Sequence, residues 1–247
     1  MMTLTKEAWA AIQHGCDDCA ICRGDAGLDT KGAVPGRPWW PECQGRLLLV
    51  SEAPPVTGGF WRTGQYDDLR EHLFCILQGL GCRFPNDLHS DVAIRSFLAE
   101  NLFLLRTVKW PLAKGNHKWR PNFNRLRPHI QDTLVTHTTA THLGPELVSL
   151  APKAVLAMGT AAWRACGTFV RTRTDLHNLR VTAARGQVYE MAVENQGIPL
   201  DVTLLPVGQN MRRPVDAATI REDIGIFFRR YRGTQLGQGD SGRASVE

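Results

Sequence analysis

Four short apolar segments, separated by amphipathic stretches, restrict the fold of this chain more than any other feature. They are "RLLLVSEA" at 46–53, "NLFLLRTVKW" at 101–110, "KAVLAMG" at 153–159 and "IPLDVTLLPV" at 198–207. Near-continuous apolar runs of this length are typical of parallel strands buried on both faces. Because helical patterns alternate with them, we predict an α/β protein: a three-layer sandwich with a central, mainly parallel four-stranded sheet.

Helical periodicity fills the intervals between these strands. The expected helices cover 5–15, 66–81, 132–151, 160–167 and 214–232, and the third is expected to break near Gly144 and Pro145. The length of 247 residues favours one large domain over two, by the ordinary size of domains. We predict a Cys-bearing N-terminal extension at 1–45 packed on the core, an α/β domain at 46–232 and a flexible tail at 233–247, which has little to bury.

The chain shows no sign of a membrane segment. No apolar run approaches the ~18 residues of a bilayer span, and "MMTLTKEAWAAIQHGC" lacks the three parts of a signal peptide. We therefore expect a cytoplasmic protein without a membrane partner, acting as a monomer.

Positive charge is concentrated in one segment. The formal net charge is +5, and residues 104–129 hold seven Lys or Arg and no acid, interleaved with Trp110, Trp119 and Phe123. Cations for phosphates beside rings for bases are typical of a nucleic-acid groove. DNA is therefore the expected partner; the alternative is a solvated basic loop.

Four of the seven cysteines lie close together near the N-terminus, at Cys16, Cys19, Cys22 and Cys43. In a reducing compartment, such clustering favours a metal over disulfides. Two residues between cysteines let both thiolates reach one ion, so the four thiolates are candidates for a zinc ion or an iron–sulfur cluster. The alternative is a set of unligated cysteines packed in an N-terminal subdomain.

Four polar loops follow the four predicted strands. They read "SEAPP", "RTVKWP", "MGTAA" and "PVGQNMRRP". The carboxyl ends of parallel strands meet at one edge of a sheet, where ligands of α/β folds bind. We expect the functional site at this edge.

These loops, in this order, resemble those of the uracil-DNA glycosylase superfamily, most closely its iron–sulfur-cluster branch. The branch has Gly-Glu-Ala-Pro-Gly after its first strand, then a Gly-rich loop with an aromatic residue, Asn-Val-Val-Lys-Cys, Gly-Asn-Arg and His-Pro-Ala-Ala-Leu-Leu-Arg-Asn-Pro. The matching segments here are 51–55, 58–65, 106–110, 115–117 and 206–214. The resemblance covers about residues 45–230 and implies the same α/β fold.

The resemblance, together with the chemistry of neighbouring residues in the same loops, indicates a role for each candidate site residue. Glu52 would act at the sugar of an extruded nucleotide, with Gln209 or Asn210 donating to the departing base. The base-binding residues would be Ala53, Pro54, Phe60, Trp61 and Arg106, with one of the two aromatic rings stacking on the base. The DNA-binding residues would be Lys109, Asn116, Lys118, Arg212 and Arg213.

Three departures from the family pattern redirect the expected activity. Arg106 replaces the asparagine that reads uracil, and a guanidinium offers donors only, whereas cytosine presents N3 and O2 as acceptors. Pro206 replaces the histidine of the last motif, which is why Gln209 and Asn210 are candidates. The later two cluster cysteines align near Trp110 and Thr139, so any metal needs another ligand set, with Cys22 and Cys43 as replacements.

We therefore predict a monofunctional DNA glycosylase that releases a modified cytosine, such as glucosylated hydroxymethylcytosine in phage DNA, and leaves an abasic site. The cofactor is not needed for this chemistry. One alternative is uracil repair with Arg106 rotated away; another is a non-catalytic nucleic-acid-binding relative.

Six of these candidate residues also have a structural alternative. Glu52 could cap the neighbouring helix, and Phe60 and Trp61 could be core residues. Arg106 could turn outward to a phosphate. Asn116 could serve only in a turn, and Lys109 could pack its stem.

Overall fold

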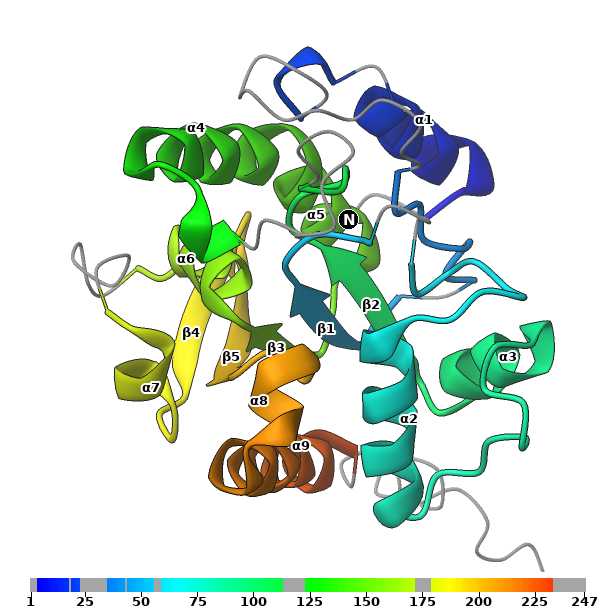
Figure 1. The fold of residues 1–247 in the computed structure, drawn as a ribbon. Coiled ribbons are helices and arrows are strands. Elements are labelled where there is room, and N and C mark those ends of the chain that lie inside the picture. The colour runs from blue at the N-terminus through cyan, green and yellow to red at the C-terminus, as the bar shows by residue number, and fades with distance from the viewer. Residues whose placement is uncertain are drawn as a thin grey trace, which may run out of the picture.

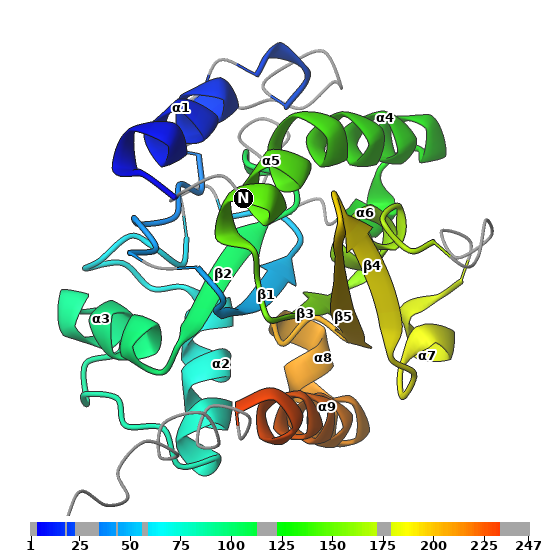
Figure 2. The ribbon, with the colours of Figure 1, turned by 180° about the vertical axis from the view of Figure 1, so that it is seen from behind.

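A central sheet with helices on both faces forms the body of the protein (Figure 1, Figure 2). The computed structural model describes residues 4–17, 19–22, 35–42, 44–55, 59–112, 123–171 and 179–232, without the side chains of 16 and 17. The strands are β1 (Leu47–Ser51), β2 (Leu102–Arg106), β3 (Ala154–Met158), β4 (Tyr189–Val193) and β5 (Gln196–Thr203). The α-helices are α1 (Lys6–Asp17), α2 (Asp68–Gly79), α3 (Asp91–Ala99), α4 (Pro128–Thr138), α5 (Gly144–Leu150), α6 (Thr160–Gly167), α7 (Val181–Ala184), α8 (Gly208–Arg212) and α9 (Pro214–Arg232). A 3-10 turn, η2, spans Phe123–Arg125, and a π-helical turn, η3, spans Thr139–Leu143.

The sheet has the order β2-β1-β3-β5-β4, in which only the β4–β5 pair is antiparallel. This confirms the predicted α/β class and the mainly parallel sheet, but the described residues form five strands rather than four. The strand missed from sequence is β4, which pairs with β5 through a two-residue turn at Glu194 and Asn195. Buried and more exposed residues alternate along β4, so it lacks the continuous apolar run that marked the other strands.

Helices cover the two faces of the sheet in separate layers. Strands β1, β2 and β3 are buried along their whole length, as a sheet covered on both faces requires. Helix α6 packs on β1 and β3, while α9 packs on β3 and β5 and also contacts α2. Figures 1 and 2 show α1, α4 and α5 on one side of the sheet, with α2, α8 and α9 on the other. The arrangement is a three-layer α/β sandwich.

The helix expected over 132–151 does not break at Gly144 and Pro145. Instead, α4 passes through the π turn η3 directly into α5, and Pro145 stands in the first turn of α5. The N–H of Gly144 donates to the carbonyl of Thr139, five residues earlier. Proline lacks a donor and clashes with the preceding turn of an α-helix, so a wider turn at this point lets the chain remain helical.

The N-terminal segment packs on the rest of the molecule where it is described. Helix α1 contacts η3 and α5, and the ring of Trp9 meets that of Phe103 edge-on, with centroids 5.8 Å apart. The predicted tail at 233–247 lies outside the described residues. Within the described part of the chain, no helix has the length and apolar character to cross a bilayer.

A buried ion pair connects α5 to the end of β2. The Nζ atom of Lys109 lies 2.5 Å from Oε2 of Glu146 and donates to the carbonyl of Arg106 at 2.6 Å. The side chains of Lys109 and Glu146 are 1% and 0% exposed. The other oxygen of Glu146 accepts from Nε2 of Gln13, on α1, at 2.9 Å. One carboxylate therefore joins three segments that are far apart in sequence.

The variant Glu146→Leu should lower the free energy of unfolding by about 3–5 kcal/mol, because it leaves the Lys109 ammonium buried without a counter-charge. The double variant Lys109→Met/Glu146→Leu should recover most of this loss, since both buried charges are then removed. Urea denaturation of the wild type and both variants measures the difference. A double variant no more stable than the single one would contradict this account.

Candidate functional site

The strand order reverses direction beside β1, which creates a topological switch point. The chain passes from β1 to β2 on one side and then crosses to β3 on the other, so connections leave the carboxyl ends of β1 and β3 in opposite directions. In open α/β sheets, ligands bind in the crevice outside such a point. Glu52 follows β1 directly, and Gly159 follows β3. The two lie on either side of the switch point.

The carboxylate of Glu52 is held at the first turn of α6. Its Oε1 accepts from the backbone N–H of Thr160 at 2.9 Å and of Ala161 at 3.4 Å. Gly159 makes this approach possible, because a Cβ there would lie 2.8 Å from Oε1 and its φ is +92°. The structure thus realises the helix-capping alternative for Glu52, and does so at the edge where the catalytic role was predicted.

The environment of Glu52 favours a carboxyl that binds its proton more tightly than usual. Burial raises the pKa of Glu52, while the N–H groups of Ala161 and Thr160 and the charge of Arg106 act against this rise. A carboxylate with a raised pKa at a strand end is a candidate acid–base or electrostatic group.

Arg106 points inward at the same edge. It is the last residue of β2 and stands in register with Ser51 of β1. Its Nη1 donates to the carbonyl of Ala53 at 3.2 Å, its Nη2 lies 3.5 Å from Oδ2 of Asp67, and the residue is 4% exposed. Among the described residues, Nη2 has no hydrogen-bond partner, although the ion pair with Asp67 holds it in place. The outward, phosphate-facing alternative for Arg106 is not the arrangement in this structure.

Asp67 was not singled out from the sequence, yet it organises this edge. Its Oδ1 accepts from the N–H of Arg70 at 2.8 Å and so caps α2, while its other oxygen faces Arg106. Arg70 is fully buried and donates to the carbonyls of Phe60 and Arg62 at 2.8 and 3.0 Å. The start of α2 therefore fixes both the guanidinium and the loop after β1.

Phe60 and Trp61 lie in an aromatic cluster of the core. They are 0% and 4% exposed; Phe60 meets Phe74 and Phe97 edge-on, and Nε1 of Trp61 donates to the carbonyl of Leu104. Both rings have the core role that was the alternative at these positions. Stacking of either ring on a base would require it to leave this cluster.

The last loop comes close to Glu52 but offers a different set of groups from those of the resembled family. A Cβ at Gly159 would also lie 3.1 Å from Cβ of Leu205, which places this loop beside the carboxylate. Asn210 is half-buried and donates from Nδ2 to the carbonyl of Leu205 at 2.9 Å, whereas Gln209 is exposed. Their role as donors to a departing base stays a prediction.

The expected DNA-binding and base-binding residues differ in how far they are exposed to solvent. Arg212 and Arg213 are exposed, and Arg213 lies 3.8 Å from Asp216. Lys109 is buried against Glu146, so its ammonium is withdrawn from the surface where a phosphate would bind. Asn116 and Lys118 lie outside the described residues, while Ala53 is half-buried and Pro54 buried.

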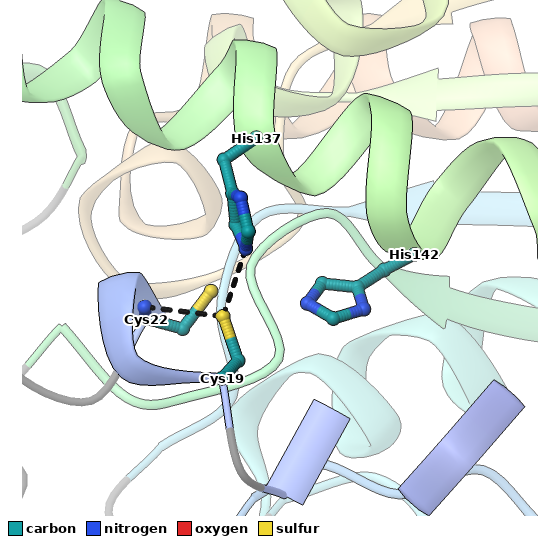
Figure 3. A group of neighbouring side chains, drawn as sticks. All are labelled: Cys19, Cys22, His137 and His142. Atoms are coloured by element: carbon teal, nitrogen blue, oxygen red, sulfur yellow. Dashed lines mark hydrogen bonds between the residues drawn. The ribbon is translucent and has the colours of Figure 1, made fainter. Parts of the chain in front are cut away.

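A second cluster of reactive side chains lies where the N-terminal segment meets the α4–η3–α5 helix (Figure 3). Cys19, Cys22, His137 and His142 bring one ligand atom each to within 4.8 Å of one another, an arrangement that could hold a metal ion. Sγ of Cys19 lies 3.0 Å from Nε2 of His137 and accepts from the N–H of Cys22 at 3.3 Å. We call these four residues the thiolate–imidazole cluster.

The π turn explains how two histidines five residues apart share this cluster. In a regular α-helix, residues i and i+5 diverge around the axis, because a turn takes 3.6 residues. A π turn takes more residues and brings the i+5 position back toward the same side. Burial and the nearby charge of Lys109 together lower the pKa of His142 to about 4. Burial also lowers the pKa of His137. Both imidazoles are therefore neutral at neutral pH, and the neutral imidazole is the form that binds metals.

Two of the four predicted metal ligands lie in this cluster, which could hold a metal ion. Cys19 and Cys22 belong to the cluster, whereas the side chain of Cys16 and the whole of Cys43 lie outside the described residues. The two histidines were missed. Their signal was the "HTTATH" spacing, which brackets Thr139, the position where the resembled branch has a cluster cysteine. In a regular α-helix, histidines at that spacing point in different directions, so the spacing does not predict a shared metal site unless a π turn is present.

Comparison with known proteins adds no relative to this picture. Neither a scan against protein-family models nor a search of curated proteins finds a match for the chain.

The variant Gly159→Ala should lower the free energy of unfolding by at least ~1–2 kcal/mol, because a Cβ at positive φ is strained and would press on Glu52. Gly167→Ala is the matched control at the other end of α6, where a Cβ would meet nothing within 4 Å. It should be neutral or stabilising by up to ~1 kcal/mol. Urea denaturation compares the two, and equal stabilities would contradict the close packing inferred around Glu52.

Proposed function

We propose that this protein is a monofunctional DNA glycosylase that hydrolyses the N-glycosidic bond of a modified cytosine. The observation that supports this most is the pair of buried charges at the switch point: the Glu52 carboxylate beside the inward-facing Arg106 guanidinium. A nucleotide placed there would have its sugar near the first group and its base edge near the second.

Glu52 would act on the sugar. When the bond between C1′ and the base nitrogen breaks, positive charge develops on the deoxyribose, and a nearby carboxylate stabilises it. Water then forms the new bond to C1′, and its proton ends on the released base, so that an abasic site remains with the strand intact. Because the N–H groups of Thr160 and Ala161 fix Oε1, the carboxylate needs little reorganisation during the reaction.

Arg106 would select the base. Its guanidinium has donors only, so it matches the N3 and O2 acceptors of cytosine and leaves the N3–H of uracil without a partner. Mismatched polar groups in a buried site are costly, and selectivity against uracil follows. Asp67 and the carbonyl of Ala53 restrain the guanidinium, which limits the rotation that uracil would demand.

The substrate we infer is DNA that carries bulky cytosine modifications, with glucosylated hydroxymethylcytosine of phage DNA as the specific case. Arg212 and Arg213 are exposed at the end of the last loop and would bind the flanking phosphates. An enzyme with this specificity would act in defence against phages. A metal in the thiolate–imidazole cluster would have no part in bond cleavage.

A second candidate function, a non-catalytic nucleic-acid-binding protein, is favoured by one observation. Phe60 and Trp61 are buried in the core, so neither ring is positioned to stack on an extruded base. Binding of modified DNA without release of any base would support this candidate.

The test uses duplexes that contain cytosine, uracil, hydroxymethylcytosine or glucosylated hydroxymethylcytosine, with abasic sites measured by alkaline cleavage. We expect abasic sites only with a modified cytosine, and a loss of at least ~100-fold in Glu52→Gln. Glu222→Gln, at an exposed position of α9, is the matched control and should retain full activity. Activity on uracil alone, or equal activity in Glu52→Gln, would contradict the proposal.

Activity should also depend on pH through Glu52. The carboxylate is the active form, and burial raises its pKa above the usual 4.5, so the protonated form persists to higher pH. Activity should therefore fall as pH drops through this raised pKa, and the acid limb of the kcat/KM profile should lie above that of an ordinary glutamate. A profile with its acid limb at or below the usual value would show that another group controls the rate.

A further inference from the structure

We propose that the thiolate–imidazole cluster binds a single Zn²⁺ ion, in place of the iron–sulfur cluster that the resemblance implies. The ligands are the Sγ atoms of Cys19 and Cys22 and one ring nitrogen each of His137 and His142. Two thiolates and two imidazoles in tetrahedral arrangement are a structural zinc set.

The size of the cluster separates one ion from an iron–sulfur centre. Around a tetrahedral zinc with bonds of about 2.0–2.3 Å, neighbouring ligand atoms lie about 3.3–3.8 Å apart. Here all four ligand atoms are within 4.8 Å of one another, so small inward shifts complete the site. An iron–sulfur cluster places several iron and sulfide atoms between its ligands and needs them farther apart. The arrangement therefore fits a mononuclear site and does not fit a cluster.

Charge and burial also agree with zinc. Cys19, Cys22 and His142 are 7%, 0% and 2% exposed, so a charged ion here must be neutralised by its own ligands. Two thiolates balance the two positive charges of Zn²⁺. Because four protein ligands fill a tetrahedron, the site has no open position for substrate and is structural.

The ion would support the edge that carries Arg106. It would join the segment of Cys19 and Cys22 to the α4–η3–α5 helix, which also carries Glu146. Lys109 bonds both Glu146 and the carbonyl of Arg106. The helix that supplies two ligands of the metal therefore also supplies the partner of Lys109, which bonds the end of β2.

The first measurement is the metal content of the purified wild-type protein, with X-ray absorption at the zinc edge. We expect one zinc per chain with two sulfur ligands at about 2.3 Å and two nitrogen ligands at about 2.0 Å. Iron with inorganic sulfide and visible absorption, a shell of four sulfurs, or no zinc after reconstitution with zinc salts would each overturn the proposal. These measurements use the wild-type protein, so they require neither glycosylase activity nor the folding of a variant.

Ligand variants identify the residues. Cys22→Ser and His142→Ala should weaken zinc affinity at least ~100-fold in competition with a chromophoric chelator, more than loss of an outer-shell partner usually does. The matched controls are Cys75→Ser on α2 and His129→Ala in the first turn of α4, both exposed. They should bind zinc like the wild type. Loss of zinc in Cys16→Ser and Cys43→Ser, with full binding in His142→Ala, would overturn the assignment in favour of the four-cysteine set.

Discussion

The ion pair between Lys109 and Glu146 is the interaction on which the other features of the structure converge. It is buried completely, so its two charges must be matched by each other and by the neighbouring hydrogen bonds. Through Gln13 it reaches α1, and through the carbonyl of Arg106 it reaches the end of β2. The α4–η3–α5 helix that carries Glu146 also carries the two histidines of the thiolate–imidazole cluster. Desolvation offsets most of the attraction within such a pair, so the pair itself adds little stability, whereas loss of one partner leaves a buried charge and is costly.

The carboxyl edge of the sheet, where β2 ends, holds several charged side chains that are shielded from water. Glu52 and Asp67 are carboxylates around one guanidinium, Arg106, and all three are largely buried. Each is restrained by backbone groups: Glu52 by the first turn of α6, Asp67 by the N–H of Arg70 and Arg106 by the carbonyl of Ala53. Charges fixed in this way are suited to stabilising a charged transition state, since little reorganisation is needed when that state forms. This is the physical basis of the glycosylase proposal.

Much of the fold and part of the site could be predicted from local pattern. The continuous apolar runs of β1, β2 and β3 predicted a buried parallel sheet, and Glu52 was expected at the edge where it lies. The hairpin strand β4 was missed because its residues alternate between buried and exposed. The aromatic pair at Phe60 and Trp61 was assigned to a base, whereas packing with Phe74 and Phe97 places it in the core. A local sequence does not reveal which apolar surface a ring will meet.

The sequence by itself determined the α/β class, the position of the polar loops after the buried strands and the presence of a Cys-x2-Cys pair, because these depend on periodicity and spacing within short segments. Only the tertiary structure decided which groups meet. It brought His137 and His142 to Cys19 and Cys22 through a π turn, and it set Asp67 against Arg106. The reason is physical: ligand sets and buried charge pairs join residues that are distant along the chain, and their contacts follow from packing, which no local pattern encodes.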